Sequence, residues 1–245
     1  MYYEDYCRTN SIETAAPLGT GDFYAQLQRI AKRRSRALQE IAQMTTKEEP
    51  FFSAVFQRGL DIVLSLLGMC VGALPFLIIA IAIKLDSRGS VFYCQTRVGR
   101  GGQLFEMVKF RTMRQDAESN TGPVWAAKHD PRLTYVGAFL REYRFDELPQ
   151  LINILLGEMT FVGPRPERPE FVYRFIQCMP AFERRHDVKP GIAGLAQLYN
   201  GYDSSPMSIY KKLRWDAVYI RKKSLTFDCV VLYRTVMAVL RGKIQ

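Results

Sequence analysis

The strongest constraint in this sequence is a run of 22 residues without a charged side chain, from Ile62 to Ile83, bounded by Asp61 and Lys84. At about 1.5 Å of rise per residue, a helix of this length reaches across a hydrocarbon core roughly 30 Å thick. The run therefore predicts a membrane anchor. We divide the chain into a polar N-terminal segment (1–50), the anchor (51–85) and an ordered domain (86–245).

Two features bear on how the anchor sits in the bilayer. Cationic residues flank both of its ends, with Arg58 before the run and Lys84 and Arg88 at its end. Because loops rich in Lys and Arg stay cytoplasmic, both flanks favour the same side. Pro75 lacks an amide hydrogen and kinks a helix. A re-entrant helix that bends near Pro75 accounts for these features, and a full crossing is the alternative.

The composition favours an anionic partner in a reducing compartment. Lys and Arg number 34 and Asp and Glu 24, a net charge of +10 that suits phosphates, an anionic lipid leaflet or nucleic acid. No nucleic-acid recognition motif is visible, so a nucleic-acid partner is not expected. The five cysteines form no metal-binding or disulfide pattern, and the N-terminus does not read as a signal peptide.

Local patterns predict several further elements. Residues 1–20 have no sustained period and are expected to lack fixed structure, whereas 21–43 read as a basic amphipathic helix that lies on a leaflet or is solvated.

Residues 91–98 and 104–110 predict a β-hairpin with Gly99–Gly102 as its turn; a phosphate-cradling loop is the alternative there. Lys109 and Arg111 share one face at its end. Residues 136–144 predict a short helix, and 225–240 an interfacial or core helix.

The chemistry-bearing stretch begins at Asp146 and Glu147, which precede an apolar-faced helix that Gly157 ends. One interpretation makes Asp146 the N-cap and Glu147 a partner of the helix dipole. The other makes a carboxylate the nucleophile toward phosphorus, assisted by a divalent cation and by arginines that hold phosphates. The candidate arginines are Arg141, Arg144 and Arg165, the last held between two prolines.

Three motifs together carry a resemblance to a known family: DELPQ at 146–150, GPRPERP at 163–169 and KPGIAGLAQ at 189–197. With these motifs the chain resembles, over about residues 56–242, the bacterial sugar transferase family. Its members are monotopic polyprenyl-phosphate phosphoglycosyl transferases that start the assembly of exopolysaccharides and other surface glycans.

The resemblance implies an α+β, mostly helical fold: a re-entrant helix broken near Pro75, a small hairpin, and a catalytic domain with interfacial helices on the cytoplasmic face of the bacterial inner membrane. Many members have Ser before that proline, where this chain has Leu74. The implied reaction moves a sugar 1-phosphate from a UDP-sugar to undecaprenyl phosphate and releases UMP. The implied partners are these two substrates and the anionic inner leaflet. Whether the protein is a monomer or a homodimer is left open by the sequence.

In that family the matching Asp is the nucleophile that forms a covalent phosphosugar intermediate, so this role falls on Asp146. Glu147 is implied to act in acid–base chemistry and, with Asp146, to place Mg²⁺. The substrate-binding residues expected from the motifs and the nearby cations are Lys109, Arg111, Arg141, Arg144, Arg165 and Gln197. The alternative function is a non-catalytic, membrane-anchored scaffold that binds a nucleotide sugar.

Overall fold

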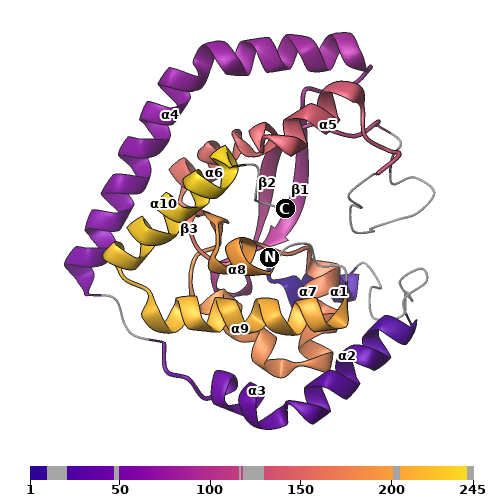
Figure 1. The fold of residues 1–245 in the computed structure, drawn as a ribbon, viewed down its shortest axis with the longest axis vertical. Helices are drawn as coiled ribbons and strands as arrows, with labels where there is room; N and C mark the ends of the chain where they lie inside the picture. The colour runs from indigo at the N-terminus through magenta and orange to yellow at the C-terminus, as the bar shows by residue number, and fades with distance from the viewer. Residues whose placement is uncertain (10–20, 47–49, 116, 118–129, 201–204, 242–245) are drawn as a thin grey trace.

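The structure, a computed structural model, describes residues 1–9, 21–46, 50–115, 117, 130–200 and 205–241. The described chain is mostly helical with two small sheets (Figure 1). Its α-helices are α1 (Tyr3–Thr9), α2 (Gly21–Arg33), α3 (Ser35–Ala42), α4 (Phe51–Asp86), α5 (Tyr135–Glu142), α6 (Gln150–Leu156), α7 (Pro169–Cys178), α8 (Leu195–Tyr199), α9 (Pro206–Lys222) and α10 (Leu225–Leu240). The strands are β1 (Phe92–Val98), β2 (Leu104–Phe110), β3 (Thr160–Val162) and β4 (Gly191–Ala193), and the 3₁₀ helices are η1 (Arg100–Gly102), η2 (Phe145–Glu147) and η3 (Pro180–Asp187).

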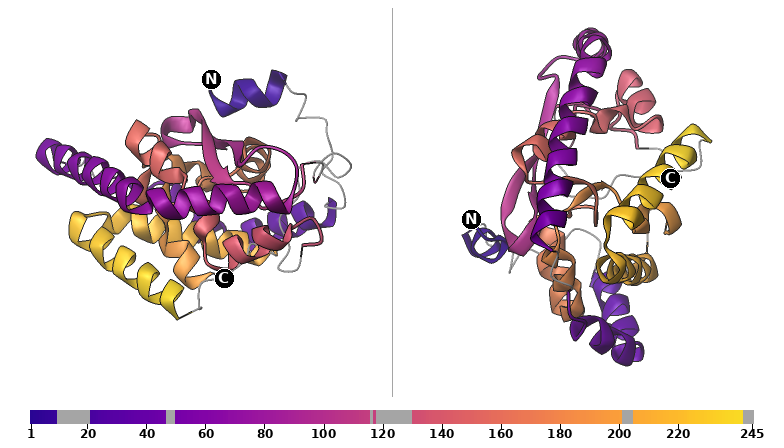
Figure 2. Two further views of the ribbon diagram at one scale, coloured as in Figure 1. Left: turned by 90° about the horizontal axis from the view of Figure 1, so that it is seen from above. Right: turned by 90° about the vertical axis from the view of Figure 1, so that its left-hand side faces the viewer.

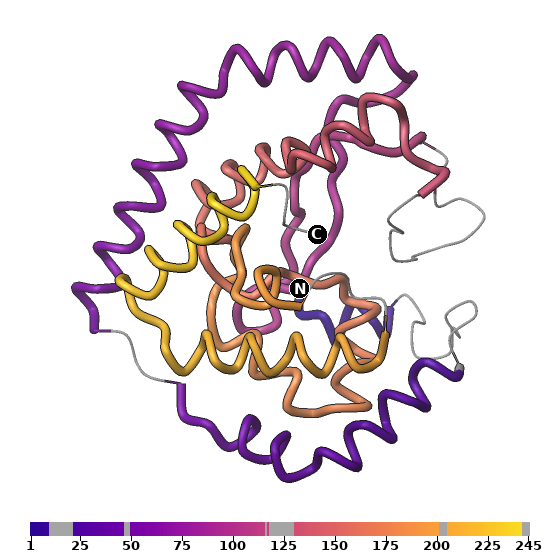
Figure 3. Tube along the Cα trace, viewed as in Figure 1, coloured from indigo at the N-terminus to yellow at the C-terminus, as the bar shows by residue number. Residues whose placement is uncertain are grey.

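Helix α4 contains the predicted anchor and is longer than the apolar run, with 36 residues. Among the described helices it is the one long and apolar enough to cross a membrane. The helix is continuous through Pro75 instead of breaking there, and it bends partway along its length (Figure 3). A proline in the helix interior is a sufficient cause of such a bend. Both ends of α4 contact the same folded domain, through Arg58 at its start and Asp86 at its end.

The predicted hairpin is confirmed. Strands β1 and β2 pair antiparallel, with Phe92 opposite Phe110 and Val98 opposite Leu104. Gly101 (φ 64°) and Gly102 (φ 78°) occupy the left-handed backbone region in the connecting turn, where a side chain would be strained. The second sheet is a parallel pair of β3 and β4. It brings the loop at 163–166 beside the segment at 189–194, far apart in sequence.

The N-terminal segment is built into the domain. The expectation that residues 1–20 lack fixed structure is wrong for 3–9, which form α1 with Tyr3 and Cys7 buried. The helix predicted over 21–43 exists as α2 and α3, along the lower edge of Figure 1. Its apolar residues, including the fully buried Leu27, belong to one core cluster with residues of α7, η3 and α9. This face is therefore not free to lie on a leaflet, whereas basic residues such as Arg36 are exposed.

Two helices flank the site stretch much as predicted. Helix α5 lies within two residues of the expected range, and α6 ends at Gly157, whose φ of 87° is the left-handed conformation of a glycine C-cap. Helix α10 is not a core helix: it buries Asp228 and Val231 and exposes apolar residues such as Tyr233 and Leu240. The hairpin lies on one side of α4 and α10 on the other (Figure 2).

Candidate active site

A pair of adjacent buried carboxylates, Asp146 and Glu147, forms the centre of the candidate site in η2. The residues are 5% and 6% exposed, respectively. The N-cap interpretation of Asp146 is wrong, because α6 begins only after Pro149 and has no side-chain cap. Instead Asp146 Oδ1 is buried without a hydrogen-bond partner. An unpartnered buried carboxylate oxygen is costly, so this atom is a candidate for contact with a ligand.

Three cations converge on a single oxygen of Glu147. Its Oε1 lies 2.5 Å from Arg165 Nη2, 3.4 Å from Arg144 Nη1 and 3.9 Å from Lys109 Nζ. These side chains come from three separate segments: the loop after β3, the turn after α5, and strand β2. Together with Arg141, whose charge acts on Asp146, the cations outnumber the two carboxylates. The arrangement therefore favours a ligand with more than one negative charge.

The environment separates the protonation behaviour of the two acids. Burial raises the pKa of Asp146, and the charge of Glu147 raises it further, more than the nearby cations lower it. Burial alone would also raise the pKa of Glu147, but its three cations lower it well below the ordinary value. Burial and the neighbouring Arg165 lower the pKa of Lys109 to about 7. Such divergent shifts in adjacent groups are typical of functional sites.

Backbone geometry places Arg144 and Arg141 beside the acids. Arg144 has φ 60° and is the only non-glycine residue with a positive φ in the part of the chain that the structure describes. This conformation costs roughly 1–2 kcal/mol for an ordinary residue, so the surrounding contacts must hold it. Arg141 Nε donates to Thr112 Oγ1 at 3.0 Å, which orients its guanidinium near Asp146.

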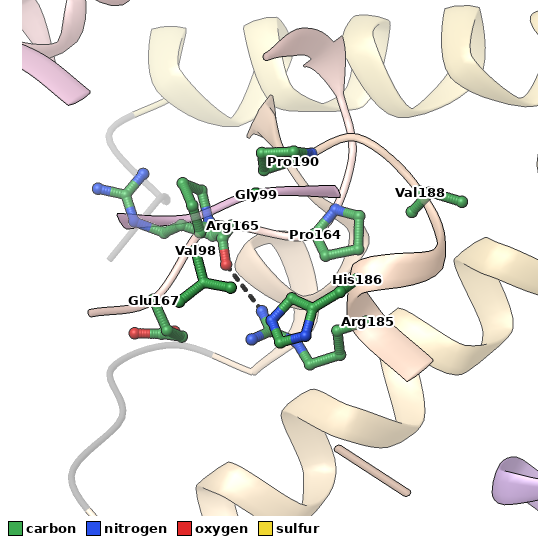
Figure 4. Close-up of a pocket in the computed structure, with 10 residues that line it drawn as sticks. Val98, Gly99, Pro164, Arg165, Glu167, Arg185, His186, Val188 and Pro190 are labelled. Atoms are coloured by element: carbon green, nitrogen blue, oxygen red, sulfur yellow. Dashed lines mark hydrogen bonds between the residues drawn. The ribbon is translucent and has the colours of Figure 1, made fainter. Parts of the chain in front are cut away.

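The backbone of the loop that carries Arg165 is fixed by contacts on the side away from Glu147. Gly163 and Gly191 approach so closely that a Cβ added to Gly191 would lie 2.0 Å from Gly163 N. Arg185 Nη2 donates to the Arg165 carbonyl oxygen at 2.8 Å, and its Nε donates to the buried Asp216 at 2.6 Å. In Figure 4 the Arg165 side chain extends away from Arg185. Its backbone is therefore fixed on one side while its guanidinium faces Glu147.

A small pocket lies behind this loop, lined among others by Glu167, Arg185 and His186 (Figure 4). Glu167 pairs with Lys212 of α9 and, at 3.9 Å, with Arg97 of β1. Burial would raise the pKa of Glu167, but its cations lower it to about 2. Burial and the charge of Arg185 lower the pKa of His186 to about 3, so this imidazole is neutral at pH 7.

Helix α6 is tied to the hairpin that carries Lys109. Asn153 Nδ2 donates to the Glu106 carbonyl oxygen at 2.7 Å, and its Oδ1 accepts from Val108 N at 3.0 Å. Asn153 occupies the position that a partner strand would take, so a side chain completes the edge of β2. This contact fixes the helix that follows the carboxylates relative to Lys109.

Two of the predicted binding residues, Arg111 and Gln197, lie in different surroundings from the cations around Glu147. Arg111 Nη2 donates to the Ser87 carbonyl oxygen at 2.8 Å, and Nη1 donates to the Arg88 carbonyl oxygen, so its guanidinium holds the loop after α4. Gln197 lies by the Arg165 loop: a Cβ added to Gly194 would lie 2.9 Å from its Oε1, which is buried without a partner. The phosphate-binding roles of both residues stay predictions.

Reasoning from the sequence did not identify the residues whose contacts fix the Arg165 loop, the hairpin and helix α6 around the two carboxylates. They are Arg97, Asn153, Glu167, Arg185, Lys212 and Asp216. Their pairings join positions up to 70 residues apart, as between Arg97 and Glu167, and Arg97 Nη1 also donates to the Pro166 carbonyl oxygen at 3.1 Å. One signal in the sequence could have pointed to them. The charged run ERRHD at 183–187 directly follows apolar residues that pack in the core, so some of its charges had to be buried and paired.

Among the described residues no group of three or more His, Cys, Asp or Glu side chains could by itself hold a metal ion. Mg²⁺ at phosphate sites, however, is bound by one or two carboxylates and completed by phosphate oxygens and waters. Asp146 has an unpartnered oxygen and lies next to Glu147. The two residues therefore fit a Mg²⁺ ion whose remaining ligands come from the substrate.

The fold and the site together define a class: a domain joined to one long apolar helix, with a buried carboxylate pair among cations suited to a phosphate-bearing substrate. The family model described as bacterial sugar transferase matches residues 52–242, and the chain belongs to this family. The resemblance inferred from the three motifs is thereby confirmed. Helices α1–α3 precede the matched range.

Individual relatives agree with this assignment. The chain is 39% identical over 189 residues to the UDP-N-acetylgalactosamine-undecaprenyl-phosphate N-acetylgalactosaminephosphotransferase of Aeromonas hydrophila, covering 77% of this chain and 44% of the relative. It is 38% identical over 197 residues to the exopolysaccharide production protein PSS of Rhizobium leguminosarum bv. phaseoli, covering 77% and 98%. It is 39% identical over 184 residues to the UDP-glucose:undecaprenyl-phosphate glucose-1-phosphate transferase of Escherichia coli (strain K12), covering 74% and 39%. The chain thus spans less than half of the first and third relatives and nearly all of the second.

Proposed function

We propose that this protein transfers a sugar 1-phosphate from a UDP-sugar to undecaprenyl phosphate, giving a polyprenyl-diphosphate-linked sugar and UMP, as an early step in making an exopolysaccharide or another surface glycan. The observation that carries the proposal is the buried Asp146, with an unpartnered oxygen, beside a carboxylate surrounded by cations. Membership in the family and the names of the relatives support the same reaction.

The reaction proceeds in two displacements at one phosphorus atom. A carboxylate oxygen of Asp146 attacks the sugar-bearing phosphorus, the phosphoanhydride bond breaks, and UMP leaves with the bridging oxygen. An oxygen of undecaprenyl phosphate then attacks the same phosphorus, and the bond to Asp146 breaks. Arg165, Arg144 and Lys109 hold the donor phosphates and balance the charge that develops on them.

The local electrostatics suggest a specific role for Glu147. Its lowered pKa keeps it ionised at neutral pH, so it is poorly suited to donate a proton. We therefore assign Glu147 to holding the three cations in place, with Asp146 as the group that reacts. Asp146 and Glu147 are the residues that would hold a Mg²⁺ ion, which would supply further neutralisation of the phosphate charge.

The reaction needs a site at the membrane surface, because the phosphate of the carrier stays there while its tail is in lipid. The two ends of α4 contact one domain, as expected for a re-entrant helix that enters and leaves the same leaflet. The exposed apolar residues of α10, and Tyr135 and Phe139 of α5, suit the interface beside it. Because the protein has a net charge of +10, we place its domain at the anionic cytoplasmic face of the inner membrane.

Release of UMP tests the proposal. Purified protein with Mg²⁺, undecaprenyl phosphate and a panel of UDP-sugars should release UMP with at least one donor. Asp146→Asn, which keeps the size of the side chain but not its charge, should abolish release. Donor binding without UMP release by the wild type would instead favour the scaffold function, and normal turnover by Asp146→Asn would remove Asp146 as the nucleophile.

A further inference from the structure

The first part of α4 is attached to the helix that follows the carboxylate pair. Arg58 Nη1 donates to the Ile154 carbonyl oxygen and Nη2 to the Leu155 carbonyl oxygen, both at 2.6 Å. These acceptors are among the last four carbonyls of α6, which lack the usual partner four residues on within the helix; the Ile154 carbonyl oxygen also accepts from Gly157 N at 2.9 Å. A guanidinium at this end also interacts favourably with the helix dipole. Arg58 thus caps α6 from a position 96 residues earlier in the chain.

Further contacts align the two helices. A Cβ added to Gly68 would lie 3.1 Å from Leu151 Cδ1, so α4 and α6 approach closely at a second point along α4. Between the two points, Asp61 Oδ1 accepts from Thr160 Oγ1 at 3.1 Å. Thr160 begins β3, the strand that leads into the Arg165 loop. One face of α4 therefore holds both α6 and the strand that leads to Arg165.

Helix α6 is held from two sides, and its buried Leu151 and Ile154 share one core cluster with residues of the hairpin. It is seven residues long, too short to be stable alone, and it lies between α4 and the hairpin. On the hairpin side Asn153 binds β2, and on the α4 side Arg58 binds the C-terminal carbonyls. Because the carboxylates directly precede α6, a shift of this helix moves Asp146 relative to Lys109 and Arg165.

We propose that Arg58 is a positioning residue of the active site, and that the first turns of α4 hold the reacting carboxylate in place as well as contributing to the anchor. This inference rests on the proposed function. A displacement of about 1 Å is enough to cost on the order of 100-fold in rate. In the part of the chain that the structure describes, the Arg58 guanidinium donates to the Ile154 and Leu155 carbonyl oxygens and not to either carboxylate, so its loss removes no group that binds the donor phosphates.

The test compares Arg58→Gln with Arg36→Gln, a loss of the same charge at an exposed position of α3 whose side chain is 96% exposed. In Arg58→Gln the kcat for UMP release should fall at least about tenfold, while the donor KM stays within about twofold. Amide hydrogen exchange should rise in residues 150–159 and not in α9. Arg36→Gln should behave as wild type in both measurements.

Arg58→Lys tests the two-pronged geometry, because a lysine keeps the charge but cannot place two fixed donors on both carbonyls. Arg58→Lys should have a kcat between those of the wild type and Arg58→Gln. If Arg58→Gln does not fold, Arg58→Lys is the variant compared with the wild type. A wild-type kcat in a folded Arg58→Gln, or in Arg58→Lys where the former does not fold, overturns the inference. If the wild type itself releases no UMP, the proposed function fails, and unchanged exchange in residues 150–159 of Arg58→Gln overturns the positioning role separately.

Discussion

Mild acid should destabilise this protein through His186. The imidazole is buried, its Nδ1 has no hydrogen-bond partner, and Arg185 lies next to it in the chain. Burial and the charge of Arg185 lower its pKa from 6.5 to about 3 in the folded state, more than Glu167 raises it. In the unfolded chain the ordinary pKa returns. The unfolded state therefore binds more protons below pH 6.5, so stability is lost as the pH falls through this value.

The magnitude follows from the two pKa values. Between pH 7.5 and pH 5 the unfolded histidine takes up nearly one proton and the folded one almost none. This difference lowers the free energy of unfolding by about 2 kcal/mol. For a chain of this size the loss corresponds to a decrease in Tm of roughly 4–8 °C. Glu167, with a pKa of about 2, contributes only at lower pH.

Thermal unfolding of the protein in lipid nanodiscs, followed by intrinsic fluorescence at pH 7.5 and pH 5, measures this effect. His186→Gln removes the titrating group, so its Tm should fall by about 4–8 °C less than that of the wild type over this range. Only the pH dependence is compared, because the substitution also changes the absolute Tm. His129, the other histidine in the sequence, is present in both proteins. Equal decreases in wild type and variant would refute the reasoning.

Three further outcomes are expected. Arg165→Ala should lower kcat/KM for UMP release by about 10²–10³-fold, with the exposed Arg36→Ala unchanged. Leu27→Ala should reduce the free energy of unfolding by about 2–5 kcal/mol although Leu27 lies outside the family match, while Arg29→Ala on the same helix should change it by less than about 0.5 kcal/mol. In a variant lacking the native cysteines, Arg36→Cys should react with an impermeant thiol reagent in broken but not intact cells, since labelling from outside would mean that α4 crosses the bilayer.

The elements predicted from sequence were those with strong local signals. The hairpin has β-prone runs around Gly99–Gly102, and its register needs no information from distant residues. Gly157 ends α6 because glycine readily takes the left-handed conformation found there. The long apolar helix follows from composition alone. The carboxylate pair was found because the motifs around it carry a family resemblance, not because of the spacing of its residues.

What the sequence did not predict depends on contacts between distant segments. Asp is a residue type that often forms an N-cap, and Asp146 precedes a helix. The chain, however, turns at Arg144 in a left-handed conformation, and the Asp146 carboxylate is buried instead of capping α6. Helix α1 was missed because seven residues carry too weak a period to be recognised. The pair between Glu167 and Lys212 joins the Arg165 loop to α9, and only the folded chain shows these charges as partners.

The most direct test of the account is to look for the covalent intermediate. The protein is incubated with Mg²⁺ and a UDP-sugar that supports turnover, without undecaprenyl phosphate, then quenched and digested for mass spectrometry. We predict a peptide containing Asp146 that carries one phosphosugar group, formed together with one equivalent of UMP and absent in Asp146→Asn. Turnover under matched conditions without any such peptide, or with the modification on another residue, would contradict the central claim.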